Sequence, residues 1–251
     1  MSTIEMLEKN LELANYLPQV IDSVVRATVS RSTLVTSAFW YSIFKNLDFQ
    51  QFETLKKGND PNEILDKSEI KRNFDIVMEE KIDQETFNPA IESAIKGVNE
   101  DPKIKDIQVK INHQSVSLIA TSFEAFCKEH FLEVNLIEAS SNCLSIKSLY
   151  NLFSMHSKCL DTSIIFDQTT FEAKLKNDGV NVDSMKECFS YRHAIIHRAG
   201  IIDAVTVKEL NLEESSIGDP VPYFTLEKIQ EFAQSMRYAG YWIKNNAKIR
   251  S

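Results

Sequence analysis

Residues 191–203 read Tyr191-Arg192-His193-Ala194-Ile195-Ile196-His197-Arg198-Ala199-Gly200-Ile201-Ile202-Asp203, and they place two imidazoles and two guanidiniums within seven residues. The preceding segment has helical spacing, because Asp183 can cap a first turn and Met185 and Phe189 supply apolar positions. Gly200 stands where a left-handed C-cap belongs. We therefore predict a helix that begins near Asp183 and ends before Gly200, with the arginines and histidines in its last turns.

The spacing of these side chains limits the sites that they can form. Arg192 and His197 lie five residues apart, about 140° around an ideal helix, so they reach one ligand only if the helix end or a facing subunit brings them together. His193 and His197 are four residues apart and share a face, which also suits metal chelation. The metalloprotease pattern has Glu after the first His, whereas this chain has Ala194. We therefore expect no metal and no cofactor.

A structural role is the alternative for the same residues. Both histidines can simply end a core helix, while Arg192 and Arg198 interact with its terminal carbonyl groups. The sequence pattern alone leaves this interpretation open.

The arrangement resembles the signature of the HEPN (higher eukaryotes and prokaryotes nucleotide-binding) domains. That signature is an Arg, a polar residue, three further residues and a His that end a helix before a Gly-containing turn. Arg192, His193 and His197 match it. The resemblance implies an up-and-down helical bundle and a metal-independent endoribonuclease.

Other segments extend the resemblance over about residues 105–250. Residues 122–131, with the sequence Ser-Phe-Glu-Ala-Phe-Cys-Lys-Glu-His-Phe, are similar to an early core helix of these domains. Ile217-Gly218-Asp219-Pro220-Val221 and a helix from Thr225 also fit.

The resemblance implies catalytic roles for the cluster. A neutral imidazole at His197 takes the proton from a ribose 2′-hydroxyl, since an unperturbed His titrates near pH ~6.5. Arg192 stabilises the charge that accumulates on the phosphate oxygens. His193 stands where the family usually has Asn, and it orients the phosphate or assists the leaving oxygen. The products are a 2′,3′-cyclic phosphate and a 5′-hydroxyl.

Supporting roles fall to three further residues. Glu124 can pair with Arg192 or His197 and orient it, although a solvated Glu is an equally good interpretation. Tyr191 and Arg198 either pack or bind the RNA backbone.

The resemblance also suggests partners. HEPN domains commonly dimerise with their signature helices facing across a cleft, so we expect a homodimer that binds RNA. A bacterial toxin or antiviral defence effector is the implied role, with a neutralising antitoxin or another defence-system protein as a possible partner. The alternative is a non-catalytic helical module that binds RNA, a nucleotide or a protein partner.

Composition favours an all-α protein. The 251 residues are 43% hydrophobic and contain only six Gly and six Pro, which argues against many short strands and tight turns. The net charge of −8 counts against a broadly basic surface that coats nucleic acid, but it permits a short local RNA contact. Four cysteines without C-x-x-C spacing indicate reduced thiols rather than a disulfide framework or a zinc ribbon.

Neither a signal peptide nor a membrane span is expected. Charged residues occur throughout the N-terminus, and Asp22, Arg26 and Arg31 interrupt the most apolar stretch, residues 20–44. We therefore expect a cytoplasmic protein.

The polar stretch Asn99-Glu100-Asp101-Pro102 suggests a boundary between an N-terminal helical region, 1–101, and a HEPN-like domain, 102–251. Pro18 should separate two N-terminal helices, and Asn88-Pro89 should begin another. Residues 204–207 suggest a short extended piece. The expected helices cover 3–16, 18–46, 62–82, 88–97, 103–134, 146–155, 170–176, 183–199 and 226–245.

Overall fold

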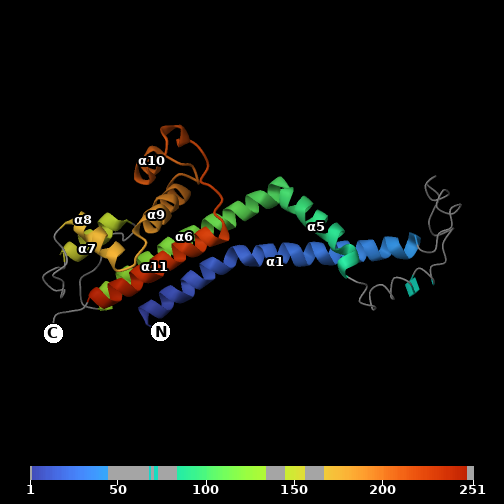
Figure 1. The fold of residues 1–251 in the computed structure, drawn as a ribbon, viewed down its shortest axis with the longest axis horizontal. Coiled ribbons are helices and arrows are strands. Elements are labelled where there is room, and N and C mark those ends of the chain that lie inside the picture. Colours follow the sequence, from blue (N-terminus) through green and yellow to red (C-terminus); the bar gives the residue numbers. More distant parts are fainter. Residues whose placement is uncertain are drawn as a thin grey trace. The chain divides into compact units, whose positions relative to one another are not determined.

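The computed structural model describes residues 2–44, 68, 71–72, 84–133, 145–155 and 167–247 (Figure 1). Across these residues the regular structure is helical, and Ile201 and Pro220 form an isolated antiparallel bridge. The all-α prediction is thus confirmed. The helices are α1 (Thr3–Phe44), α5 (Gln84–Glu100), α6 (Pro102–Glu133), α7 (Ile146–Met155), α8 (Gln168–Asn177), α9 (Val182–His197), α10 (Ala204–Leu210), the 3-10 helix η1 (Glu214–Ser216) and α11 (Leu226–Asn246).

The described chain forms two compact units that differ from the expected 1–101 and 102–251 regions. One unit joins Met1–Val20 to Ile107–Ser251, and the other comprises Ile21–Asp106. A helix boundary does lie at Asp101, whose carboxylate accepts the Lys103 backbone N–H at 2.8 Å. The first turns of α1 nevertheless belong to the bundle, because their apolar side chains are buried in its core.

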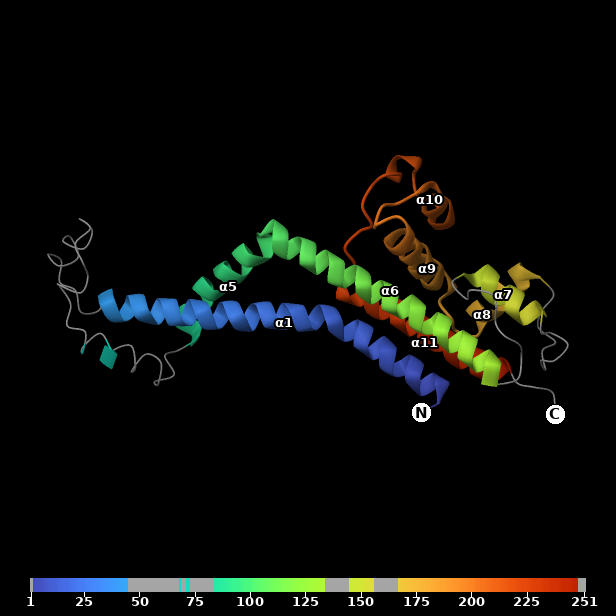
Figure 2. The same ribbon diagram turned by 180° about the vertical axis from the view of Figure 1, so that it is seen from behind.

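Aromatic side chains fill much of the core of the first unit. Phe153 lies 5.3 Å from Trp242 and 5.4 Å from Phe131, measured between ring centroids. The indole N–H of Trp242 donates to Asp178 at 2.7 Å, so this large side chain is buried with its polar group paired. Helices α6 and α11 run side by side in both views (Figures 1 and 2).

Gly240 lets the start of α1 approach α11 closely. A Cβ atom at this position would lie 2.6 Å from Leu7 Cδ2 and 3.3 Å from Ile4 Cδ1. One residue further along, the Tyr241 hydroxyl donates to Glu8 at 2.6 Å. The absence of a side chain at Gly240 therefore makes room for the packing of α1.

Two expected helix boundaries at prolines are wrong. Helix α1 continues through Pro18, and α5 begins at Gln84 with Pro89 inside it. A proline inside a helix removes one backbone donor but need not end the helix. Near Pro18, the Gln19 side-chain amide donates to the Asn15 carbonyl at 3.0 Å.

The extended piece expected at 204–207 is instead the first half of α10. The Asp203 carboxylate accepts the Thr206 backbone N–H and hydroxyl, both at 2.9 Å. This capping pattern outweighs the β preference of the residues after it. At α9, the N-cap is Asn181 rather than Asp183.

Other expectations agree with the structure or lie outside the described residues. The observed α6, α7, α8 and α11 match the expected helices within two residues at each end. Cys127 and Cys188 are buried and form no disulfide within the described ranges, whereas Cys143 and Cys159 lie outside the described residues. Most of the helix expected at 62–82 also lies outside them.

In the second unit, Arg26 of α1 contacts Asp22 at 3.0 Å and Glu92 of α5 at 3.5 Å. These three side chains are about half exposed or more, so the pairs contribute little stability. Nearby, Ile95 is buried. Within the described ranges, no helix combines the length and apolar character that crossing a bilayer requires.

Candidate functional site

Helix α9 is the element that carries the candidate residues. The Asn181 side chain caps it by accepting the Ser184 N–H at 3.1 Å. The helix packs against α7, α8, α10 and α11, and Phe189 meets Phe123 of α6 with centroids 6.0 Å apart. Its last turns are thus held on a buried scaffold.

The end of α9 is a left-handed turn that begins one residue earlier than expected. Ala199 has φ 54° and Gly200 has φ 79°. The backbone N–H groups of Arg198 and Gly200 both donate to the Ala194 carbonyl at 3.0 Å. This pattern ends the helix at His197 and turns the chain sharply.

The signature residues share the outer face of the last turns. Tyr191 and Ala194 point into the core, whereas Ile196 is 47% exposed and His197 is also exposed. The rings of His193 and His197 lie 5.0 Å apart between centroids. Helical geometry places Ile196 and His193 inside the arc of about 140° that separates Arg192 from His197.

Arg192 is half-buried at the edge of this face, and its Nε atom has no hydrogen-bond partner among the described residues. A buried guanidinium nitrogen without a partner is costly and usually has an explanation. An anion bound to Arg192 would supply the missing acceptor.

Arg198 is engaged elsewhere. Its Nε donates to Asp203 Oδ2 at 2.9 Å, which links the end of α9 to the N-cap of α10. The pKa of Asp203 is held well below its ordinary value, first by the Thr206 backbone N–H and next by the Arg198 hydrogen bond. The structure thus gives Arg198 a role in holding the turn.

Tyr191 and Glu124 also have contacts away from the imidazoles. Tyr191 is buried against Phe224, with ring centroids 5.0 Å apart, and burial raises the pKa of its phenol. Glu124 accepts a hydrogen bond from Lys128 at 2.7 Å. The expected pairing of Glu124 with Arg192 or His197 is replaced by this contact within α6.

His113 of α6 is a neighbour of the turn that sequence reasoning missed. Its ring atoms lie 3.8 Å from the position of a Cβ on Gly200, and its Nε2 lies 3.3 Å from the Pro222 carbonyl oxygen. Nothing in the local sequence around His113 signals this, because the contact joins segments far apart in the chain.

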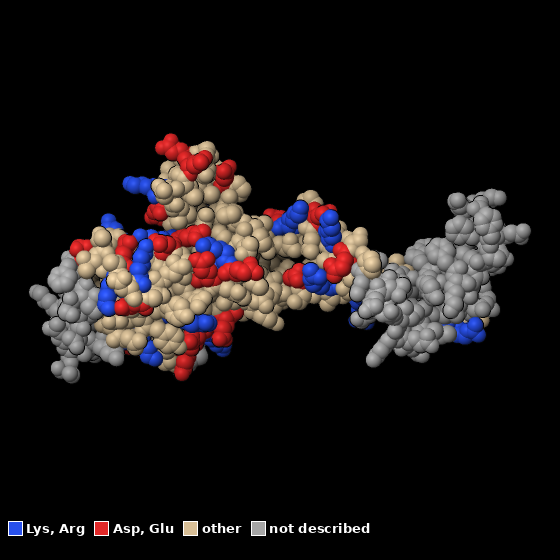
Figure 3. Space-filling view, viewed as in Figure 1, with Lys and Arg blue, Asp and Glu red and all other residues tan. Residues whose placement is uncertain are grey.

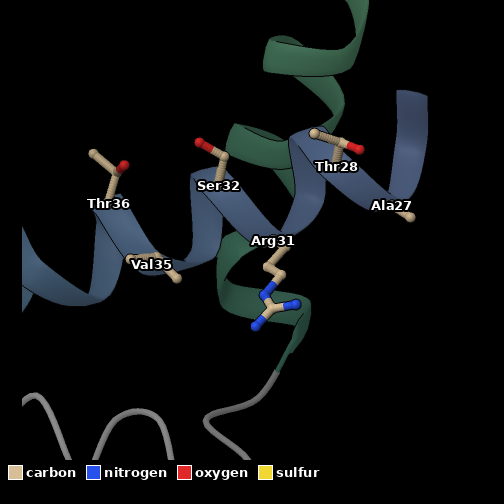
Figure 4. Close-up of a pocket in the computed structure, with 6 residues that line it drawn as sticks. All are labelled: Ala27, Thr28, Arg31, Ser32, Val35 and Thr36. Atoms are coloured by element: carbon tan, nitrogen blue, oxygen red, sulfur yellow. The ribbon is translucent and has the colours of Figure 1, made fainter. Parts of the chain in front are cut away.

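Three hollows of the described surface are lined by residues other than His193 and His197. In the second unit, a hollow along α1 has hydroxyl groups of Thr28, Ser32 and Thr36 on one side, while Arg31 points to the other (Figure 4). Its described lining residues include no imidazole or carboxylate for acid–base chemistry. In the first unit, two cavities of about 230 and 560 Å³ lie beside α9, and neither includes His193 or His197 in its lining.

Comparison with protein-family models, with curated proteins and with solved structures gave no match for this chain.

Proposed function

We propose that the chain is a metal-independent endoribonuclease of the HEPN type. The observation that carries this proposal is the outer face of α9, where the imidazoles of His193 and His197 lie 5.0 Å apart beside the unpaired Arg192 Nε. Imidazoles move protons near neutral pH, and a guanidinium binds phosphate oxygens. These are the groups that cleavage of RNA by its own 2′-hydroxyl requires.

In the proposed reaction, His197 accepts the proton of the ribose 2′-hydroxyl and the 2′-oxygen forms a bond to the adjacent phosphorus. The bond from phosphorus to the 5′-oxygen breaks, and His193 gives that oxygen a proton. Arg192 stabilises the charge on the pentacoordinate phosphorus centre. A 2′,3′-cyclic phosphate and a 5′-hydroxyl result.

The exposure of the face favours a polymeric substrate. The imidazoles do not line either cavity beside α9, so the face suits a strand that lies across the surface better than a small molecule that needs enclosure. Acidic side chains gather around α10 (Figure 3), so an RNA strand would make a short contact at the cluster.

We further propose a homodimer in which two such faces share one RNA strand. Ile196 on this face and Ile201 in the turn after it are 47% and 41% exposed, and such apolar groups suit a subunit contact. A defence role, with an antitoxin or another defence-system protein as partner, extends the same proposal.

The decisive experiment incubates purified protein with RNA in EDTA. We expect cleavage with 2′,3′-cyclic phosphate ends, and we expect His197→Ala and Arg192→Ala each to lower the rate by ~10²-fold or more without unfolding the protein. Lys208→Ala, an exposed cation on α10, is the matched control. Cleavage that persists at the wild-type rate in both variants contradicts the mechanism.

Mixing subunits tests the shared site. If both protomers contribute to one site, titrating His197→Ala subunits into wild type should change activity non-linearly. Activity strictly proportional to the wild-type fraction counts against the shared site.

A non-catalytic anion-binding module is the second candidate. Arg192 and His197 lie at opposite edges of the face, and this separation favours the second candidate. In a single chain the two side chains can each contact a phosphate group without both reaching the same atom. RNA binding without cleavage, lost in Arg192→Ala, would select this function.

A further inference from the structure

We propose that Asn112 of α6, with His113 beside it, is a positioning residue for the face of α9 that carries the imidazoles. Asn112 acts through residues 218–224, a segment between η1 and α11 that we call the strap. This proposal rests on the ribonuclease function proposed above, because it concerns the geometry of the same face. Asn112 itself is assigned no contact with RNA.

The Asn112 side chain holds both backbone polar groups of one strap residue. Its Nδ2 donates to the Phe224 carbonyl at 2.8 Å, and its Oδ1 accepts the Phe224 N–H at 2.9 Å. Asn112 is only 1% exposed, so both hydrogen bonds are shielded from water. On the next residue of α6, His113 Nε2 lies 3.3 Å from the Pro222 carbonyl oxygen. The strap is therefore fastened to α6 at two of its residues.

The strap in turn holds the chain just after His197. Its Val221 N–H donates to the Gly200 carbonyl at 2.7 Å. Its Asp219 carbonyl accepts the Ile202 N–H at 2.9 Å. Gly200 lies only three residues beyond His197, so a shift of the strap reaches the last turn of α9 through a short length of backbone.

The end of the strap also supports α9 beside Arg192. The Phe224 ring meets the Tyr191 ring edge-on, with centroids 5.0 Å apart. Tyr191 is buried and directly precedes Arg192 in the helix. Arg192 and His197 lie about 140° apart around α9, so their joint position relative to a phosphate depends on how the helix end is held. The residue that Asn112 fixes thus contacts α9 next to one of these groups, and the strap holds the turn next to the other.

Loss of Asn112 should misplace the catalytic groups without removing any of them. Asn112→Ala leaves the backbone N–H and carbonyl of Phe224 without their partner, so the strap loosens. A misplacement of about 1 Å costs up to ~10²-fold in rate, because the reaction needs aligned groups. A purely structural role predicts instead that fewer molecules are folded and that each folded molecule reacts at the wild-type rate.

Steady-state cleavage of RNA in EDTA distinguishes these two roles, with circular dichroism showing that each variant is folded. We expect kcat of Asn112→Ala to fall about tenfold or more while KM changes by less than about threefold. Gly240→Ala is the matched destabilised control, because a Cβ there meets Leu7, Ile4 and Phe126, none of which belongs to the strap. We expect its kcat per folded molecule to equal that of wild type. Equal kcat values in the two variants overturn the proposal.

Amide hydrogen exchange provides a readout that does not depend on ribonuclease activity. The Gly200 N–H donates to the Ala194 carbonyl at 3.0 Å and so reports on the turn after α9. We expect this amide to exchange about tenfold faster in Asn112→Ala than in Gly240→Ala. Equal exchange in both variants contradicts the role of Asn112, whereas wild-type protein that cleaves no RNA contradicts only the ribonuclease function.

His113→Ala keeps the proposal testable if Asn112→Ala does not fold. This variant removes the contact with the Pro222 carbonyl from a partly exposed side chain, so we expect a folded protein. Its kcat should fall about threefold, and the Gly200 amide should exchange faster than in wild type. A His113→Ala protein that matches wild type in both measurements rules out positioning through the strap.

Discussion

The Arg198 guanidinium donates from Nε to the Asp203 carboxylate at 2.9 Å, across the left-handed turn that separates α9 from α10. The same carboxylate caps α10 through Thr206. One acidic side chain therefore fixes both the end of the helix that carries the imidazoles and the beginning of the next helix.

Loss of Asp203 should destabilise the fold by about 1 kcal/mol, the usual cost of removing a helix N-cap. The pKa of Asp203 is lower in the folded protein than in the unfolded chain, so its stabilisation is complete above the unfolded value and is lost as the pH falls towards the folded value. Urea unfolding from pH 7 down to pH 3 should show a smaller acid-induced loss in Asp203→Ala than in wild type. Identical pH profiles would contradict this role.

The two left-handed residues after α9 should respond in opposite directions to exchange of Ala and Gly. Ala199 at φ 54° carries the strain of a Cβ in this region, so Ala199→Gly should stabilise the protein by up to about 1 kcal/mol. Gly200 at φ 79° has no close contact to a new Cβ, so Gly200→Ala should cost about 1 kcal/mol from backbone strain. Chemical denaturation measures the change in unfolding free energy of both variants. Changes of the same sign would contradict the strain that the left-handed conformation places on a Cβ atom at these two positions.

Gly240 should be intolerant of even one added methyl group. In Gly240→Ala the new Cβ would meet Leu7 at 2.6 Å, so we expect a loss of about 1–3 kcal/mol as α1 shifts. Gly97→Ala is the matched control, because Gly97 lies in α5 with nothing within 4 Å of a Cβ. That change should stabilise its helix by up to about 1 kcal/mol. If thermal unfolding gives the same change in stability for Gly240→Ala and Gly97→Ala, α1 does not pack tightly on α11.

His130 should make the fold sensitive to mild acid. It is 7% exposed and stacks on Phe126, with ring centroids 5.5 Å apart, and burial lowers the pKa of its imidazole despite the opposing charge of Glu133. A lowered pKa means that the neutral ring stabilises the fold above about pH 6.5 and that this stabilisation is lost as the pH falls. Urea midpoints between pH 7 and pH 5 should fall less in His130→Phe than in wild type.

The helices with clear apolar periodicity were predictable from the sequence, whereas features that depend on distant contacts were not. The expected helices at 103–134 and 226–245 match α6 and α11 closely. Helix α1 continues through Pro18, because a proline inside a helix removes one backbone donor but need not end the helix. His113 is near the turn only because α6 passes beside it.

The candidate site was predictable in its residue types and its helix, but not in its contacts. Helical spacing predicted that His193 and His197 share a face, and their rings are neighbours. Spacing could not show that Arg198 is bound to Asp203 or that Glu124 is bound to Lys128. Those partners are set by the turn and by competition among nearby charges.

The packing of α1 against α11 also constrains when the bundle can form during synthesis. Glu8 and Tyr241, which share a hydrogen bond, are 233 residues apart in sequence. At about 5–20 residues per second, the ribosome takes on the order of 10–50 s to deliver the second partner after the first. The first turns of α1 therefore lack this contact with α11 until Tyr241 has left the exit tunnel.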